Sequence, residues 1–166
     1  MLTCGLRPGD CMNSEDALKE AMSMLARNDR TVFVGQGVCY DGVWTYETLK
    51  HIPLRRKIEL PVAEELQLGI CTGLAMQGFL PVSIYPRFDF LLRALDQLIN
   101  HLDKLQAMSC GQWNPRVIIR TRVGTRSPLD AGPQHTQDHS QALRQMLTAV
   151  EVVKIVKADE VLSAYE

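Results

Sequence analysis

Glu64 is the residue whose position in this sequence most favours acid–base chemistry. It lies in the segment Glu59–Gly69, ELPVAEELQLG, where Pro61 predicts the first turn of a helix, because the N–H that proline lacks would have no partner there. Apolar residues at four-residue spacing predict the buried face of this helix: Val62, Leu66 and Ile70. A carboxylic acid held among apolar side chains is a candidate for proton transfer. The alternative is a solvated carboxylate that only complements the helix dipole.

A second candidate site is the glycine-rich stretch GQGVCYDG, which follows the apolar run Thr31–Gly35. The run predicts a central strand that is covered on both faces. A glycine-rich loop after a strand can bind a phosphate, but this one lacks the GxGxxG pattern and the Walker lysine. Turn formation therefore explains these glycines more simply than phosphate binding does.

Composition narrows the class of protein. The 166 residues are 46% apolar and 22% charged, which is typical of a globular domain, and the net charge of −1 gives no electrostatic basis for nucleic-acid binding. No apolar run approaches the length of a membrane span, and the first residues resemble neither a signal peptide nor a transit peptide. The five cysteines form no CxxC pair and no zinc-site spacing, so we expect no metal site, and reduced thiols in a cytoplasmic protein.

Helical and strand patterns alternate along the chain. Four apolar runs predict strands: Thr31–Gly35, Leu80–Tyr85, Arg116–Arg120 and Val150–Val156. Helices are predicted between them: one capped by Ser14, one opened by Pro61, a long one over Phe90–Met108, one near Ala142–Leu147 and one opening near Asp159. This order predicts an α/β fold with a mostly parallel sheet and helices on both faces. We expect one domain over residues 14–166 after a poorly ordered tail over residues 1–13.

Ligands of parallel sheets collect at the carboxyl ends of the strands. Three segments are expected there: Gly35–Gly42, Pro86–Phe90 and Thr121–His139. The last belongs to a loop that is too long for a simple connector, and loops of that length are often functional. Its Arg122 and Arg126 could meet an acidic substrate or partner, although solvated loop charges are the simpler interpretation.

Four stretches carry a resemblance to a known family: PVAEELQLG, GLAMQGFLPVSIYPRFDFLLRALDQLIN, the glycine of MSCGQWNPRVIIR, and GPQHTQ. In this order and spacing, between Thr31 and Tyr165, the chain resembles the pyrimidine-binding domain of thiamine-diphosphate enzymes. The greatest similarity is to the beta subunit of the decarboxylating component of 2-oxoacid dehydrogenase complexes. The resemblance implies the thiamine-diphosphate-binding fold, thiamine diphosphate as cofactor and a 2-oxo acid as substrate.

The resemblance also assigns site residues. It implies that Glu64 hydrogen-bonds the N1′ atom of the cofactor's aminopyrimidine and activates the cofactor by exchanging a proton with it. It implies that Phe90, with Phe88 as second choice, packs against the pyrimidine. It places His135 near the reacting centre, with His139 as the alternative if the loop register differs.

Two departures from the family pattern matter for function. Gln36 stands where the family has an acid, and the sequence lacks the Gly-Asp-Gly…Asn motif that binds the magnesium of the diphosphate. The resemblance therefore implies a component that is inactive alone, in a hetero-oligomer with an alpha-like, diphosphate-binding chain that holds the Mg²⁺. We expect an exposed apolar face where that chain docks. The alternatives are a catalytically silent assembly partner, a truncated fragment of such an enzyme, or a transketolase-like enzyme of two-carbon transfer.

Overall fold

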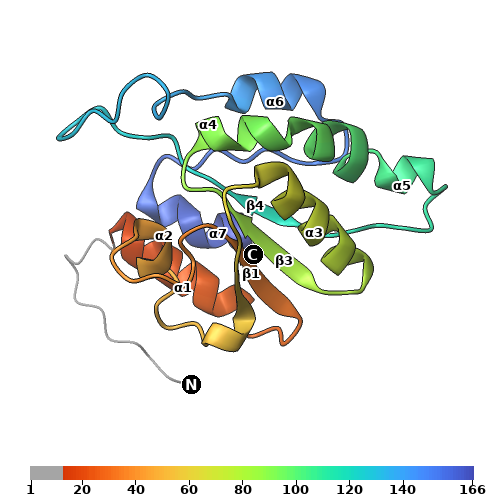
Figure 1. The fold of residues 1–166 in the computed structure, drawn as a ribbon, viewed down its shortest axis with the longest axis horizontal. Helices are drawn as coiled ribbons and strands as arrows, with labels where there is room; N and C mark the ends of the chain where they lie inside the picture. Colours follow the sequence, from red (N-terminus) through yellow and green to blue (C-terminus); the bar gives the residue numbers. More distant parts are fainter. Residues whose placement is uncertain (1–12) are drawn as a thin grey trace.

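A four-stranded parallel sheet forms the centre of the computed structural model, which describes residues 13–166 (Figure 1). The strands lie in the order β2 (Lys57–Glu59), β1 (Thr31–Gly35), β3 (Leu80–Ile84) and β4 (Ile118–Arg120). At their carboxyl ends, Gly35 pairs with Glu59 and Ile84, and Ile84 pairs with Arg120. The segments that follow all four strands therefore begin at one edge, as the sequence predicted for a parallel α/β sheet.

Helices cover both faces of the sheet (Figure 1). On one face lie α1 (Ser14–Leu25) and α7 (Val161–Tyr165), and on the other lie α3 (Glu64–Met76), α4 (Phe88–Leu91), η3 (Gln97–Leu102) and α6 (Ser140–Met146). The short elements are α2 (Trp44–Glu47), η1 (Leu54–Arg56), η2 (Leu92–Ala94), α5 (Leu105–Met108) and η4 (Ala158–Glu160). Successive side chains of β1 point to opposite faces of the sheet. Phe33 therefore packs with α1 in the core on one face, and Val34 packs with α3 in the core on the other. Within the described residues, no helix is long and apolar enough to cross a membrane.

The predicted strand at Val150–Val156 is wrong. The segment makes no ladder with β4. The N–H groups of Val150 and of Ala149 before it donate to the buried carboxylate of Asp103, and the Val152 carbonyl accepts from Arg144. The fourth strand is instead β2, whose three residues were too short and too charged to stand out in the sequence. A short, lysine-containing strand of this kind is typical of the edge of a sheet.

The beginning and the buried face of α3 also differ from the prediction. The helix begins at Glu64, three residues after Pro61. The predicted buried stripe is wrong, since the side chains of Val62 and Leu66 are 79% and 54% exposed. The buried residues of α3 are instead Glu64, Gln67, Leu68, Cys71 and Thr72, three of which carry polar side chains. The apolar pattern therefore predicted the wrong buried face of α3, because this helix contacts the sheet through hydrogen bonds as well as through apolar side chains.

Other boundaries are close to those predicted. Asn13, and not Ser14, caps α1, because its side chain accepts from the N–H groups of Glu15 and Asp16. The long helix predicted over Phe90–Met108 is divided into shorter helical elements: α4, η2, η3 and α5. The expected tail lies outside the described residues, except for Asn13.

The surroundings of Gly35 and Gly73 predict opposite effects of an alanine substitution on the free energy of unfolding. A Cβ on Gly35 would lie 2.4 Å from the Ile84 carbonyl oxygen, whereas a Cβ on Gly73 of α3 would meet nothing within 4 Å. Gly35→Ala should separate β1 from β3 and lower the free energy of unfolding by about 2 kcal/mol or more. Gly73→Ala should raise it by about 0.5–1 kcal/mol, because glycine weakens a helix interior. Urea unfolding of both variants checks the pair, and equal effects at the two positions would contradict it.

Candidate functional site

Glu64 is buried at the first position of α3, with its carboxylate only partly satisfied by the protein. Its side chain is 3% exposed. Nε2 of Gln36 donates to Oε1 at 3.4 Å, whereas the buried Oε2 has no hydrogen-bond partner in the part of the chain that the structure describes. Nε of Arg93 lies 3.6 Å from Oε2, but this arginine is 78% exposed, so water screens the ion pair. One oxygen of a buried acid thus remains available to a further hydrogen-bonding group.

Hydrogen bonds of α3 with β3 and with the residue that follows β3 hold the helix at this position. The buried Tyr85 hydroxyl donates to the Glu64 carbonyl oxygen at 3.2 Å. Burial raises the pKa of Tyr85 above its ordinary value, so the phenol keeps the proton that it donates. One turn further along, the Gln67 amide donates to Ser83 Oγ at 3.0 Å and to the Ile84 carbonyl oxygen at 3.1 Å. These bonds fix the beginning of the helix and therefore the position of the Glu64 side chain.

An open groove of about 710 Å³ runs along the first turns of α3 beside Glu64. Its polar lining includes Glu64, Arg93 and Gln97, and its apolar lining includes the exposed Val62 and Leu66. The acid therefore opens onto a surface that is largely apolar at its rim.

The glycine loop after β1 is held by a single carboxylate. Oε1 of Glu59 accepts from the N–H of Gly37 at 2.6 Å, and Oε2 accepts from those of Val38 and Cys39 at 2.8 and 2.9 Å. The N–H groups that a phosphate would need are thus already satisfied within the protein. This arrangement supports the interpretation of the loop as a turn, and it sets the backbone of Gln36 beside Glu64.

The predicted aromatic and histidine residues meet in two pairs. Phe90 packs edge-on against His135, with ring centroids 5.5 Å apart, and Phe88 packs in the same way against His139 at 5.6 Å. Phe88 is buried in the core between α3 and α6, whereas Phe90 is only half-buried. His135 Nδ1 donates to the Ala131 carbonyl oxygen at 2.9 Å, which leaves Nε2 as the acceptor of the neutral ring.

The described structure thus separates Glu64 from the two aromatic–histidine pairs. Glu64 lies with Gln36 and Arg93, and Phe90 lies with His135. The groove beside Glu64 is not lined by either member of the second pair. A direct role of Phe90, Phe88, His135 or His139 therefore stays a prediction.

Sequence reasoning missed three residues at Glu64. Gln36 was noticed only as a departure from a family pattern, although its amide is the one group that donates to the acid among the described residues. Arg93 and Gln97 both line the groove. They lie about one helical turn apart in the segment that follows Phe90. A spacing of three and four residues on a helical segment was the signal that could have indicated this shared face.

The sheet and the acid at its carboxyl edge define a class of protein, the layered α/β domains that bind ligands where parallel strands end. Residues 11–161 match the family described as "Transketolase, pyrimidine binding domain". The chain belongs to this family.

Similar curated proteins are subunits of one enzyme component. The "Pyruvate dehydrogenase E1 component subunit beta" of Rhizobium meliloti (strain 1021) is 30% identical over 149 residues, which cover 87% of this chain and 31% of the relative. The mitochondrial proteins of the same name from Caenorhabditis elegans and Drosophila melanogaster are 32% and 35% identical, over 81% and 76% of this chain and 39% and 35% of theirs. The chain spans between three and four tenths of the length of these relatives.

Proposed function

We propose that this chain is the pyrimidine-binding component of a thiamine-diphosphate enzyme that acts on a 2-oxo acid, comparable to the beta subunit of pyruvate dehydrogenase. The observation that carries the proposal is the buried carboxylate of Glu64, whose Oε2 has no hydrogen-bond partner among residues 13–166. An aminopyrimidine ring nitrogen is a suitable partner, because it can exchange a proton with a carboxylic acid in an apolar site. The residues present therefore fit the cofactor that the family binds.

Each residue of the site would contribute a separate action. Glu64 would hold and move a proton at the pyrimidine N1′ atom, while Gln36 keeps Oε1 occupied and leaves Oε2 for that contact. Phe90 would pack against the ring, and the His135 Nε2 atom would accept or donate a proton near the substrate. Bound thiamine diphosphate supplies the nucleophilic carbon that attacks the 2-oxo acid. Because this sequence lacks the magnesium motif, an alpha-like chain would hold the diphosphate and Mg²⁺.

The face around Glu64 is suited to such a partner. Val62 and Leu66, both largely exposed, flank the acid on the groove. Exposed apolar side chains that surround a functional group are typical of an interface. Docking there would cover the groove and remove water from Glu64, which strengthens proton exchange with a bound ring.

A pull-down from native extract tests the proposal. The tagged chain should recover a partner that contains the Gly-Asp-Gly…Asn motif, and the complex should decarboxylate a 2-oxo acid when thiamine diphosphate is added. The double variant Val62→Ser/Leu66→Ser should weaken recovery about tenfold or more, because truncated apolar anchors dominate losses at interfaces.

Leu54→Ser is the matched control for this docking experiment. Leu54 is 69% exposed in η1, which precedes β2 and so lies toward the amino edge of the sheet. The control should leave recovery unchanged. Recovery of a partner that depends on Leu54 instead, or of a complex without decarboxylase activity, would leave the silent assembly role as the better explanation.

A further inference from the structure

Three arginines meet at the carboxyl edge of the sheet, apart from the Glu64 groove. Arg87 and Arg122 both donate to the carbonyl oxygen of Pro86, at 2.9 and 3.3 Å. The guanidinium carbons of Arg120 and Arg122 lie 5.2 and 4.1 Å from the centroid of the Trp44 ring. These contacts link the three cations into one group, which we call the arginine cluster: Arg87, Arg120 and Arg122.

The arginine cluster has no acidic partner in the described residues. The ion pairs among residues 13–166 involve none of its members. Arg120 is 4% exposed and donates through Nη2 to Thr48 at 2.7 Å. Within residues 13–166, its buried Nη1 has no acceptor, nor does the buried Nε of Arg87. Burial, followed by repulsion from Arg87 and Arg120, lowers the pKa of Arg122 to about 10. Unpaired buried cations are costly unless an anion joins them.

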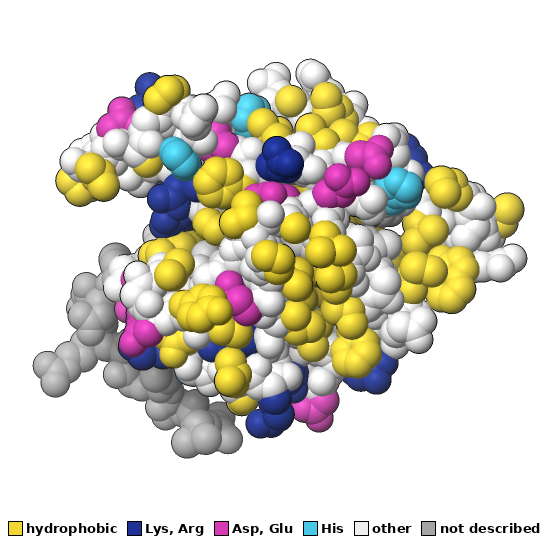
Figure 2. Space-filling view, viewed as in Figure 1, with side chains coloured by type: hydrophobic (Ala, Val, Ile, Leu, Met, Phe, Trp, Pro, Cys, Tyr) yellow, Lys and Arg dark blue, Asp and Glu magenta, His cyan; other side chains and the backbone are white. Residues whose placement is uncertain are grey.

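A cavity of about 570 Å³ is lined by two members of this cluster, Arg120 and Arg122. One part of it is lined by Trp44, Arg120, Thr121 and Arg122. The buried Oγ1 of Thr121 is a further polar atom that has no partner among the residues described. Two acids also line the cavity: Asp138 pairs with Lys154 at 2.7 Å, and Glu151 is exposed to solvent. Figure 2 shows basic side chains recessed in a notch of the surface between two lobes of the molecule. None of the residues that line this cavity lines the Glu64 groove.

We propose that the arginine cluster is a binding site for a small oxyanion, the phosphate or carboxylate group of a metabolite. Guanidinium groups bind such groups through charge-assisted N–H donors. Arg120 and Arg122 both line the cavity, and among the described residues the buried Nη1 of Arg120 has no acceptor, so it is available for such a bond. An oxyanion also removes the repulsion among the three cations. The Trp44 ring keeps the guanidinium planes in place through cation–π contacts, so the site is preformed.

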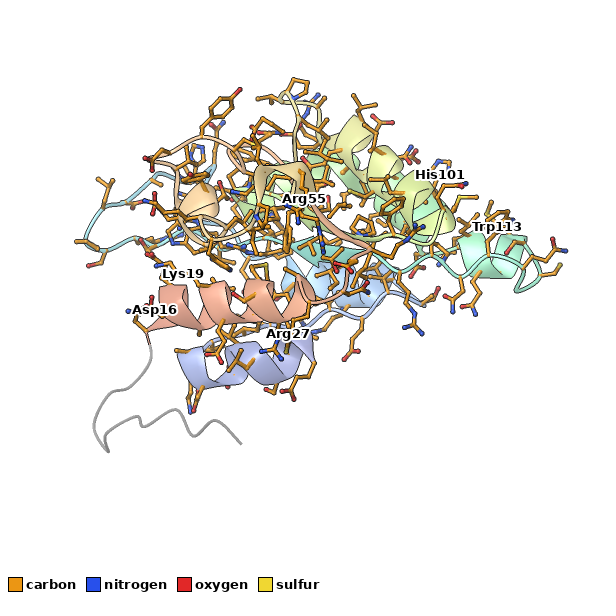
Figure 3. All side chains as sticks on the ribbon, turned by 90° about the horizontal axis from the view of Figure 1, so that it is seen from below. Asp16, Lys19, Arg27, Arg55, His101 and Trp113 are labelled. Carbon is orange, nitrogen blue, oxygen red and sulfur yellow. The ribbon has the colours of Figure 1, made fainter. Side chains whose placement is uncertain are left out.

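Tryptophan fluorescence of the full chain tests the site. The sequence has two tryptophans, and Trp113 lies beyond α5 at one end of the molecule, away from α2 (Figures 1 and 3). In a Trp113→Phe background, Trp44 reports on the arginine cluster alone. Inorganic phosphate and acetate are titrated separately at constant ionic strength, with chloride as the balancing anion. The emission of Trp44 should saturate with one oxyanion at about millimolar concentration or below, and this arm identifies phosphate or carboxylate as the bound group.

Charge-removing variants decide whether the arginines carry the signal. Arg122→Gln should weaken the saturating response about tenfold, because it removes a charge-assisted donor that lines the cavity. Arg87→Gln should weaken it less, because it removes only a neighbouring positive charge. Arg126→Gln removes the same charge from an exposed position of the same loop and should leave the response unchanged. Saturation by chloride alone, no response to either oxyanion, or equal losses in Arg126→Gln would overturn the proposal. Thermal unfolding of each variant confirms that a lost response does not come from a lost fold.

Discussion

Replacing Glu64 with glutamine is expected to lower 2-oxo acid decarboxylation by the reconstituted complex about 10²- to 10⁴-fold, the range for loss of a general acid–base group. Glutamine keeps the shape of the side chain and its contact with Gln36, but it cannot exchange a proton with the pyrimidine nitrogen. Cofactor affinity should change much less than the rate. The measurement compares the decarboxylation rate with the dissociation constant of thiamine diphosphate in the same preparation.

Glu65→Gln is the control for this substitution. Glu65 is the next residue of α3 and is exposed, so the two variants lose the same charge at neighbouring positions of one helix. The control should retain the wild-type rate to within about threefold, since exposed charges contribute little. Equal losses in the two variants, or a Glu64 variant that stays active, would show that this acid is structural. Thermal unfolding separates a failure of chemistry from a failure of folding.

The largest stability effect is expected at Asp103. Its side chain is completely buried, and its carboxylate accepts from the N–H groups of Thr148, Ala149 and Val150 at 2.8–3.1 Å and from Lys104. Asp103→Ala leaves these backbone donors without a partner at the C-terminal end of η3. The free energy of unfolding should fall by about 3–5 kcal/mol, as for a broken buried charge network. Urea unfolding measures the change, with the exposed Asp159→Ala as control, for which less than about 0.5 kcal/mol is expected.

The pH dependence of this effect has a definite sign. Burial opposes ionisation of Asp103, but hydrogen bonds from Lys104 and from the N–H groups of Val150 and Ala149 outweigh it and hold its pKa well below the usual range. A lowered pKa contributes stability that is full above the unfolded pKa of about 4 and is lost as the pH falls towards the folded pKa. The difference between wild type and Asp103→Ala should therefore be constant above about pH 5 and shrink below about pH 4. A difference that persists unchanged at pH 3 would assign the stabilisation to packing.

Patterns local to one element predicted most of the fold. The apolar runs that became β1 and β3 were found within one residue of their ends, because central strands of parallel sheets are apolar on both faces. The run Val150–Val156 is also rich in valine and isoleucine, but the N–H of Val150 and that of Ala149 before it are taken by an aspartate some 45 residues earlier in the chain. Competition of this kind between distant groups leaves no trace in a local pattern.

The candidate site shows the same limit. The acid at Glu64 could be singled out from its residue type and its place before a helix. Its surroundings could not, because Gln36 approaches from the loop after β1 and Arg93 from the segment after β3. Arg122 shows how a loop charge can be misjudged: the simpler expectation was a solvated side chain, but it lies half-buried on Trp44, whereas Arg126 is exposed as expected.

The three hydrogen bonds from the glycine loop to Glu59 fix the shape of this site. They also reduce the conformational entropy that the loop would otherwise lose when a ligand binds. Ordering the backbone costs about 1–2 kcal/mol for each residue, and here the loop is already ordered by the end of β2 before any ligand arrives. The loop carries Gln36, whose amide holds Glu64, so the orientation of the acid depends on a second carboxylate that does not touch it. Binding at Glu64 can therefore proceed without the entropic cost of closing a loop, and the affinity of the site for its ligand is in part a property of the edge strand.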